Sequence, residues 1–522
     1  MSAIGKPDPT DAPHAISRRS VLAGAAALGL SLSGLGAAAD APPAQKPRRG
    51  GNLRVAVLGG GSADTLDANL NQTQPDTARV HSLFQPLRQL RHGGAFEDLL
   101  AESMESNADG TVWTIRLRNG VTFHDGKPLR AEDVAFTLRR VTNPEAPLFG
   151  APELGPMDRD SFKILDERTL KVGMHSPFAV FDEAVADSIN LGIVPVGYDP
   201  KKPVGTGPFK FESFVPGRQS VFTRYEGYWK EPPYLDKLTI IDSFASDTAA
   251  YNALQGGQID AFAAAPLTIA RVMRPGGPIK THVSEATQWT PFVMRVDQPP
   301  FDNPDVRRAF RLIVDRAQII KIALNGFGVP GNDVFSLFDG APQAFVRHRD
   351  VDQARTLLRK AGHENLSVEL TTADIANGVV QSAQIFARQA RDAGVTVKVR
   401  QVTPDVYFGE QFLTWPFAQD FWTFNSYLTQ VALCLLPTSP YNETHWRDPA
   451  YAALYRQALS TLDATKRGEI VRQLQTLDFE QGAYIIPSHN QIVDLLAQNV
   501  NGVAPGTFMA LGDYEFAKIW LA

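Results

Sequence analysis

Alternation of apolar and polar side chains predicts a strand at residues 112–117. Trp113, Ile115 and Leu117 share one face of the extended chain, and Thr114 and Arg116 lie between them. The stretch LRVAVL at residues 53–58, which is apolar except for Arg54, predicts a second, buried strand. Glycines 59–61 end it, so we expect either a flexible strand exit there or a loop where a ligand approaches the backbone closely.

A helical repeat follows at residues 131–141. Val134, Leu138 and Val141 recur at the spacing of one helix face. Acidic side chains occupy the first turn, where the helix dipole favours negative charge. This segment therefore predicts a helix with one apolar face.

Predicted strands and helices alternate over the rest of the chain. Strand patterns occur at residues 220–229 and 238–244, and another strand enters at Ile259. Helical patterns occupy residues 247–255, 303–324, 351–361 and 379–393, the second broken near Asp315, and strands follow the last two. This order predicts mixed α/β domains.

Length and composition narrow the class of protein. The chain has 522 residues, a mass of 57.0 kDa and a formal net charge of −5. We expect two or three domains, and the balance of charge argues against a nucleic-acid partner. Cys434 is the one cysteine, which excludes an internal disulfide and a cysteine-based metal site. Its neighbours are apolar, so we expect a buried, inert thiol.

The first 39 residues resemble a twin-arginine export signal. Arg18 and Arg19 precede an Ala/Gly-rich apolar stretch that ends in Ala37–Ala39, a small-residue cleavage pattern. A membrane anchor is the alternative, which the weak apolar character of the stretch disfavours. No cysteine lies near the cleavage site to carry a lipid. We therefore predict cleavage near Ala39 and a location in the periplasm of a bacterium with an outer membrane.

The sequence lacks recognisable motifs for catalytic, metal-binding and cofactor-binding sites. The nucleophile-elbow pattern G-x-S-x-G is absent, and the H-E-x-x-H pattern that starts at His363 has Ser367 in place of its second histidine. The glycines at 59–61 lack the lysine of a phosphate-binding loop, and Asp64 stands where a dinucleotide fingerprint needs glycine. We predict no catalytic residues, no metal site, no cofactor and no enzyme activity.

Aromatic side chains crowd into residues 414–428, TWPFAQDFWTFNSYL. They can form the wall of a binding pocket, since aromatic faces offer large contact area. A core strand is the alternative. Pro416 and the interspersed Gln419, Asn425 and Ser426 favour the pocket wall.

Ordered motifs over nearly the whole chain after residue 40 resemble the solute-binding proteins of peptide/nickel-type ABC importers. Residues 203–229, PVGTGPFKFESFVPGRQSVFTRYEGYW, carry the V-G-T-G-P-Y/F-x-F signature, a P-G turn and a Y-W pair. The other matching segments are GGNLRVA (50–56), TLDANL (65–70), WTIRLRNGVTFHDGKPLRAEDVAFTLRR (113–140), PPFDNPDVRRAFRLIVDRAQI (299–319), VDQARTLLRKAG (351–362) and NETHWRDPAY (442–451).

The resemblance implies a two-lobed, three-domain α/β fold of the periplasmic binding protein type with a two-strand hinge. Domain I would comprise residues 40–80, 195–285 and 491–522, domain II residues 81–194, and domain III residues 286–490. A ligand would bind between the lobes of a monomer, which would then meet a membrane permease and its ATPase subunit. The loop at 205–208 would be structural, with glycines that permit positive φ angles.

Two positions depart from the family pattern. Asn425 replaces the aspartate that peptide-binding relatives aim at a peptide α-ammonium group, which weakens a peptide-specific reading. Arg295 replaces an asparagine, and would pair with an anionic ligand if it faced the cleft or serve as a surface arginine if it did not. The ligand-binding residues that we expect are Trp422, Asn425, Phe424, Tyr427, Arg295, Ser62, Trp289 and Tyr407.

Three functions are consistent with these patterns. The first is a receptor that captures a small peptide-like, opine-like or other amphiphilic solute for an ABC importer. The second is a receptor of the same fold for a metal chelate or haem, for which His445 and His489 are weak ligand candidates. The third is a secreted hydrolase, which would turn over its substrate rather than retain it.

Overall fold

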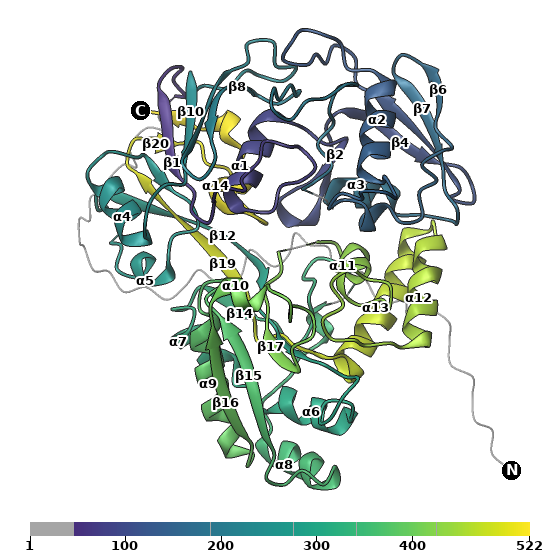
Figure 1. Cartoon of the computed structure of the whole chain (residues 1–522), viewed down its shortest axis with the longest axis vertical. Helices are drawn as coiled ribbons and strands as arrows, with labels where there is room; N and C mark the ends of the chain where they lie inside the picture. Colours follow the sequence, from purple (N-terminus) through teal and green to yellow (C-terminus); the bar gives the residue numbers. More distant parts are fainter. Residues whose placement is uncertain (1–45, 188, 275, 341, 424) are drawn as a thin grey trace, which may run out of the picture. The chain divides into compact units, whose positions relative to one another are not determined.

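The computed structural model describes residues 46–187, 189–274, 276–340, 342–423 and 425–522, and Pro47–Ala522 form one compact unit (Figure 1). The export signal that we predict at residues 1–39 lies outside the described residues. Among the helices of the described part, none has both the length and the apolar character needed to cross a membrane.

The largest sheet has eight strands. β1 is parallel to β10 and β11, and the other neighbours are antiparallel. In spatial order the strands are β12 (Ile279–Trp289), β19 (Ser488–Ala497), β11 (Ala261–Phe262), β1 (Asn52–Ala56), β10 (Lys237–Ile241), β9 (Gln219–Arg224) and β8 (Phe209–Val215), and β14 (Gly328–Pro330) pairs with β19. The helices that contact the sheet are α1 (Gln74–Leu83), α4 (Asp247–Gln255), α5 (Leu267–Ala270), α7 (Arg316–Ile322) and α14 (Ala510–Asp513).

A smaller antiparallel sheet lies in residues 101–173. Its strands in order are β4 (Ala101–Ser106), β5 (Val112–Leu117), β7 (Thr169–Gly173) and β6 (Lys163–Asp166). Nearby elements are the pair β2 (Arg88–Leu90) and β3 (Phe96–Asp98), helices α2 (Ala131–Val141) and α3 (Phe181–Asp187), and the short helices η1 (His92–Gly94) and η2 (Pro152–Leu154). The predicted alternation is confirmed because the odd-numbered side chains of β5 from Trp113 on are buried, as is the apolar face of α2.

A five-stranded sheet organises residues 292–485. Its strands in order are β16 (Thr396–Val402), β15 (Ser367–Ala373), β17 (Phe417–Gln419), β13 (Phe292–Met294) and β18 (Tyr484–Ile485). The helices of this region besides α7 are α6 (Pro304–Ile313), α8 (Val351–Lys360), α9 (Val379–Asp392), α10 (Pro404–Tyr407), α11 (Tyr427–Cys434), α12 (Pro449–Ser460) and α13 (Ala464–Gln481), with η3 (Pro342–Ala344). The break predicted near Asp315 is confirmed, since its side chain accepts a hydrogen bond from Gln318 N and caps α7.

Apart from β14, which pairs with β19 at the edge of the larger sheet, the chain passes between the two large sheets twice. We call residues 47–289 and 488–522 lobe 1 and residues 292–485 lobe 2. β12 leads into β13 across residues 289–292, and β18 leads into β19 across residues 485–488 (Figure 1). The α/β class with mixed sheets is confirmed. The domain boundaries given above stay a prediction. The last elements of lobe 1 along the chain are β20 (Val500–Asn501), η4 (Phe516–Lys518) and β21 (Trp520–Leu521).

The glycine loop before β8 has a different physical reason from the one we expected. Neither Gly205 nor Gly207 has a positive φ angle. A Cβ atom on Gly205 would lie 2.0 Å from Leu83 O, and one on Gly207 would lie 2.5 Å from Leu83 C. His124 fixes the loop, since its Nδ1 accepts from Gly205 N and its Nε2 donates to Gly207 O. The glycines are needed for close approach to α1, so the φ-angle argument was wrong.

Lobe 2 buries a charge cluster around Asp333, which is 2% exposed. Asp333 pairs with Arg316 at 2.7 Å and with Arg347 at 2.5 Å, and its Oδ1 accepts from Ile486 N. Arg311 lies close by and donates to Tyr484 O and Phe479 O. The cluster thus ties α6 and α7 to the second crossing of the chain.

Candidate functional site

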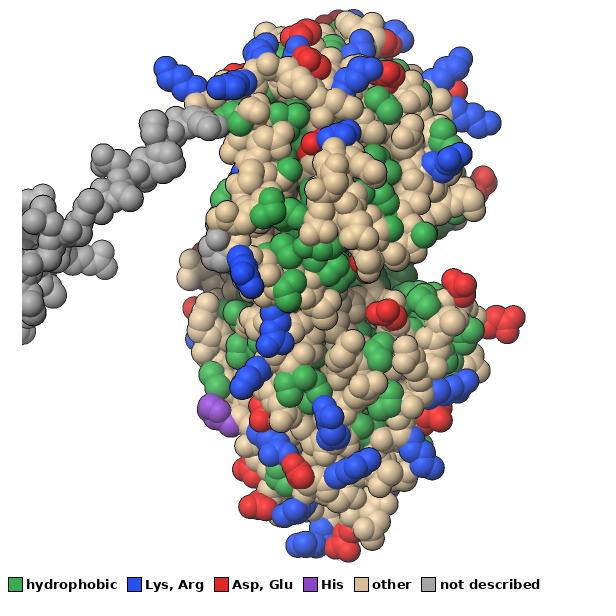
Figure 2. All heavy atoms as spheres, turned by 90° about the vertical axis from the view of Figure 1, so that its left-hand side faces the viewer, with side chains coloured by type: hydrophobic (Ala, Val, Ile, Leu, Met, Phe, Trp, Pro, Cys, Tyr) green, Lys and Arg blue, Asp and Glu red, His purple; other side chains and the backbone are tan. Residues whose placement is uncertain are grey.

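A cavity of about 1550 Å³ is lined by residues of both lobes. Lobe 1 contributes Pro47, Gly59, Pro208 and residues within 71–97, 149–153, 186–192, 228–234 and 502–520, and lobe 2 contributes residues within 405–441. On the face drawn in Figure 2, hydrophobic side chains gather at mid-height, where the surface is hollowed, while charged side chains spread above and below. A cavity of this size accommodates a small organic molecule.

Aromatic side chains dominate the wall from lobe 2. The apolar members are Phe408, Phe412, Phe421, Trp422, Leu433 and Tyr441. Trp422 is fixed by a bridge to Trp289, with Trp289 N donating to Trp422 O at 3.0 Å and Trp422 N donating to Trp289 O at 2.8 Å. The two indole rings stack with centroids 5.9 Å apart. Trp422 therefore contacts the first crossing of the chain through Trp289 and also lines the cavity.

A pair of buried carboxyl groups lies behind Trp422. Glu443 accepts hydrogen bonds from Trp422 Nε1 and from the Tyr484 hydroxyl at 3.3 and 3.0 Å. Burial raises the pKa of Asp420 to about 6, and burial together with the charge of Asp420 raises the pKa of Glu443 well above its usual value. Burial therefore favours the protonated form of Glu443, and a pair of carboxyl groups that shares a proton carries less charge than two carboxylates.

Among the expected ligand-binding residues, Trp422 and Asn425 line the cavity. Asn425 Nδ2 donates to Gln430 Oε1 at 2.9 Å, which orients its amide. Trp289 is buried between Trp422 and Phe335, behind the wall. Phe424 lies outside the described residues.

The other four expected residues lie away from the described lining. Tyr407 is buried against Trp415. The Tyr427 hydroxyl bonds to Tyr451 and Asp478 in the core. Arg295 pairs with Asp297 and donates to the backbone outside the lining, and Ser62 is exposed outside it. The buried state predicted for Cys434 is confirmed.

A charged wall from lobe 1 was missed by sequence reasoning. Arg91 pairs with Glu97 and Glu515, Lys230 with Glu97, and Lys518 with Glu515. The wall combines three separate segments, around residues 91–97, 230 and 515–518, that share no motif. The available signal was the presence of Glu515 and Lys518 one helical turn apart. Their ion pairs give the wall its polarity without leaving an excess of positive charge.

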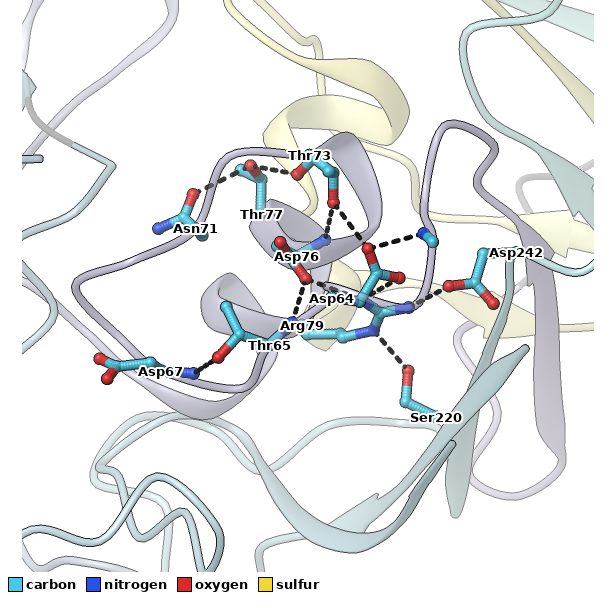
Figure 3. A network of polar contacts seen from close by, with 11 residues as sticks. Asp64, Thr65, Asp67, Asn71, Thr73, Asp76, Thr77, Arg79, Ser220 and Asp242 are labelled. Carbon is cyan, nitrogen blue, oxygen red and sulfur yellow. Dashed lines mark hydrogen bonds and ion pairs between the residues drawn. The ribbon is translucent and has the colours of Figure 1, made fainter. Parts of the chain in front are cut away.

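Behind the part of the cavity lined by α1 lies the network drawn in Figure 3. Arg79 is fully buried and pairs with Asp64 at 3.0 Å, Asp76 at 2.9 Å and Asp242 at 2.5 Å. Burial, together with a hydrogen bond to Asp64, raises the pKa of Asp242 to about 6, although Arg79 opposes the shift. Burial also raises the pKa of Asp76.

Gly60 makes room for this network. A Cβ atom there would lie 2.5 Å from Asp64 Oδ2 and 2.7 Å from Asp242 Oδ2. The preceding Gly59 has φ +96° and lines the cavity. The glycine run therefore follows β1 and places Gly59 at the cavity, and the close approach of a ligand to this backbone stays a prediction.

The family model of the bacterial extracellular solute-binding proteins, family 5, matches residues 95–444, about two-thirds of the chain. The chain belongs to this family. Its members are solute-binding receptors of ABC importers rather than enzymes, and the protein is such a receptor. In the described residues, no group of three or more His, Cys, Asp or Glu side chains is placed to hold a metal ion.

One curated relative and two solved structures are similar to this chain over most of their length, and the structures show the fold. The glutathione-binding protein GsiB of Pectobacterium atrosepticum is 25% identical over 494 residues, which cover 88% of this chain and 92% of GsiB. The structure of DppA from Helicobacter pylori in complex with the peptide STSA has a TM-score of 0.77 and 22% identity, covering 91% of this chain and 98% of DppA. AgaA from Agrobacterium tumefaciens R10, in complex with agropinic acid, also has a TM-score of 0.77 at 22% identity, covering 90% of this chain and 99% of AgaA.

Proposed function

We propose that this receptor captures a small peptide-like or other amphiphilic organic solute between its lobes and delivers it to a membrane permease. The observation that carries this proposal is the cavity of about 1550 Å³, which has an aromatic wall from lobe 2 and a polar wall from lobe 1. One wall suits the apolar part of a solute and the other its hydrogen-bonding groups.

Delivery requires that the lobes separate and close again. The two chain crossings are the natural hinge, because they are the covalent links between the lobes. Contacts that opening would break include Ala179 N to Leu459 O at 2.6 Å and the ion pair of Arg467 with Glu183 at 3.2 Å. A solute shifts this equilibrium only as far as it binds the closed state more tightly than the open state.

The ligands named for relatives support the broad class of solute. GsiB is named for glutathione, and the two structures contain a peptide and agropinic acid. All three are small organic molecules rich in polar groups. Asn425 in place of the aspartate of peptide-binding relatives argues against a solute held mainly through its α-ammonium group at that position.

The finer points of the receptor model belong to the same proposal. Residues 1–39 would direct export to the periplasm and be removed near Ala39. The exported chain would act as a monomer with separate permease and ATPase subunits. N-terminal sequencing of protein from a periplasmic extract tests the cleavage site, since a terminus at Asp40 is expected.

Native mass spectrometry of residues 40–522, purified without denaturation, tests the receptor function. We expect a discrete added mass from a co-purified solute, and a metal would be visible in its isotope pattern. If only the mass of the unliganded protein is observed, the next experiment is thermal-shift screening of peptides, opines, sugars and metal chelates. A solute at about 100 times its Kd adds about 2.7 kcal/mol of stability. Turnover of a substrate without retained solute would overturn the proposal.

The variant Trp422→Ala tests whether the solute binds in the cavity. We expect at least about tenfold weaker affinity for the solute found, since a half-buried tryptophan in a binding wall is typically an energetic hot spot. Trp415→Ala is the matched control, because Trp415 is buried outside the cavity lining and should affect stability without affecting affinity. Equal affinities of Trp422→Ala and wild type for the solute would show that the aromatic wall is not part of the binding site.

A further inference from the structure

A buried carboxyl group supports the aromatic wall from behind. Glu443 is 4% exposed and lies outside the described cavity lining. Its Oε1 atom accepts hydrogen bonds from Trp422 Nε1 at 3.3 Å and from the Tyr484 hydroxyl at 3.0 Å. Donors that face the protein interior need such an acceptor, because an unpaired N–H or O–H group away from water costs free energy. Glu443 therefore acts on the wall through Trp422 rather than through contact with a solute.

The bond to Glu443 determines which edge of the Trp422 indole faces the cavity. Two backbone hydrogen bonds tie Trp422 to Trp289, and the two rings stack with an interplanar angle of 17°. Stacking restrains the plane of the indole but is compatible with a flipped ring, since the second side-chain torsion of tryptophan is broad and roughly two-fold. The bond to Glu443 selects one of the two orientations. Because the N–H group points to Glu443, the wall offers ring surface to a solute and withholds this donor.

Glu443 also connects the wall to both chain crossings. Tyr484 lies in β18, directly before the second crossing at residues 485–488. Trp289 ends β12 at the first crossing, and its ring meets the Tyr484 ring edge to face with centroids 5.5 Å apart. The Tyr484 hydroxyl and the Trp422 N–H group bond to the same carboxyl oxygen. A change in the position of this oxygen therefore affects the cavity wall and the crossings together.

We propose that Glu443 is a positioning residue that fixes the Trp422 indole with its N–H group turned away from the cavity, and that links this orientation to the two crossings. The inference deepens the receptor function proposed above and rests on it for its consequence, a preference for solutes whose apolar part lies flat on the ring. The geometry requires an oxygen acceptor at this position. An amide oxygen can accept the same two bonds, whereas an apolar side chain would leave both donors unpaired.

Asp420 supports the neighbouring residue of the same wall. Its carboxylate accepts from Phe421 N at 2.7 Å, and Phe421 lines the cavity. Burial and the charge of Asp420 raise the pKa of Glu443, so glutamine imitates the favoured neutral form of Glu443. Glu443→Gln therefore preserves the acceptor, and Glu443→Met, which has a similar length, removes it.

The indole N–H signal of Trp422 in nuclear magnetic resonance spectra tests the inference without a solute. Residues 40–522 contain all seven tryptophans, and tryptophan with a nitrogen isotope label in its indole ring gives one N–H signal for each. Trp422→Phe assigns the signal by its loss. We expect Glu443→Met to speed the exchange of this N–H group with water by about tenfold, as for one lost hydrogen bond, and Glu443→Gln to change it by less than about threefold.

Asp478→Leu is the matched control for Glu443→Met. Asp478 is a buried carboxyl group of the same lobe that accepts from the hydroxyl groups of Tyr427 and Tyr451, and it lies outside the cavity lining. Its replacement removes an acceptor from two buried donors, as Glu443→Met does. We expect it to lower stability and to leave the exchange of the Trp422 N–H group unchanged.

The thermal-shift screen of peptides, opines, sugars and metal chelates gives the second readout. Compounds that stabilise wild type should bind Glu443→Met about tenfold more weakly and Glu443→Gln within about threefold of wild type. Equal affinities of Glu443→Met and wild type for these compounds would overturn the consequence for the solute.

The outcomes separate the two proposals. Unchanged exchange of the Trp422 N–H group in Glu443→Met, or equal changes in Glu443→Met and Glu443→Gln, overturns the positioning role and leaves the receptor function standing. If no solute co-purifies and no compound stabilises wild type, the receptor function fails, and the exchange measurement still decides the orientation of Trp422. If Glu443→Met does not fold, Glu443→Asp replaces it, since its carboxyl group is one methylene shorter, and it should also speed the exchange.

Discussion

Each lobe buries a cluster of charges, and the two clusters have opposite composition. In lobe 1, one guanidinium, Arg79, faces three carboxylates. In lobe 2, one carboxylate, Asp333, faces Arg316 and Arg347, with Arg311 close by. A surplus of carboxylates can be relieved by taking up a proton, whereas arginine keeps its charge at any physiological pH.

The excess charge is compensated differently in the two clusters. The arginines of lobe 2 donate to backbone carbonyls, such as those of Tyr484 and Phe479. In lobe 1, the pKa of Asp242 rises to about 6, so that this carboxyl binds a proton in mildly acidic solution. We therefore expect the lobe 2 cluster to keep its charges across the physiological pH range and the lobe 1 cluster to respond to pH.

Removing the single carboxylate of lobe 2 should have the largest effect. Asp333→Asn leaves buried arginines without a counter-charge, and we expect a loss of about 3–5 kcal/mol in the free energy of unfolding. The loss should be the same at pH 5 and pH 8, because arginine does not titrate there. Urea denaturation measures it. Asp297→Asn, at a more exposed pair, is the control and should cost under about 1 kcal/mol.

Removing the guanidinium of lobe 1 should have a slightly smaller effect that depends on pH. We expect Arg79→Gln to cost about 3 kcal/mol at pH 8, where three buried carboxylates are left without their cation. At pH 5 the cost should be lower, because protonation relieves part of their repulsion. Denaturation curves at both pH values decide the point, and equal losses would contradict the contrast between the clusters.

Gly60→Ala tests how tightly the lobe 1 cluster is packed. The added methyl group would meet the carboxylates of Asp64 and Asp242 at 2.5 and 2.7 Å, so we expect a loss of about 1–3 kcal/mol. Gly61→Ala is the matched control, since a Cβ atom there meets nothing within 4 Å. Similar thermal denaturation midpoints for the two variants would show that the cluster can move aside.

Of the four variants, Asp242→Asn should change the free energy of unfolding least at pH 5. It should change the pH dependence of that free energy most clearly. The folded pKa of Asp242 lies above its unfolded value, so its contribution to stability is fully present below about pH 4 and is lost as the pH rises towards 6. The asparagine imitates the protonated form and removes that loss. We expect a change under about 1 kcal/mol at pH 5, and a variant at least as stable as wild type at pH 7. A pH profile of unfolding that keeps the wild-type slope would rule out Asp242 as the titrating group.

Local patterns predicted most of the fold. The strand at 112–117 and the helix at 131–141 were found at their observed bounds, because alternation and the 3.6-residue repeat depend on neighbours along the chain. The break at Asp315 was visible for the same reason, since a helix cap is a local interaction. The close approach of Gly205 to Leu83 was not, because it joins segments that no pattern relates.

The site was predictable only in part. Residues 414–428 contain pocket-lining and core aromatics side by side: Trp422 faces the cavity, whereas Trp415 and Tyr427 pack inside lobe 2. Composition cannot separate them, since the segment changes from β17 to an irregular stretch to α11 within a few residues. The charged wall depends on pairs such as Arg91 with Glu515, whose partners meet only in the folded chain.

The C-terminal segment has a consequence for biosynthesis. Residues 502–520 form part of the cavity wall, and the second crossing of the chain at residues 485–488 precedes them, separated by β19 and β20. A ribosome that has made the first 480 residues has therefore produced a chain with one link between its lobes and an incomplete binding site. We therefore expect a chain that ends before residue 502 to lack part of the wall that would contact the solute.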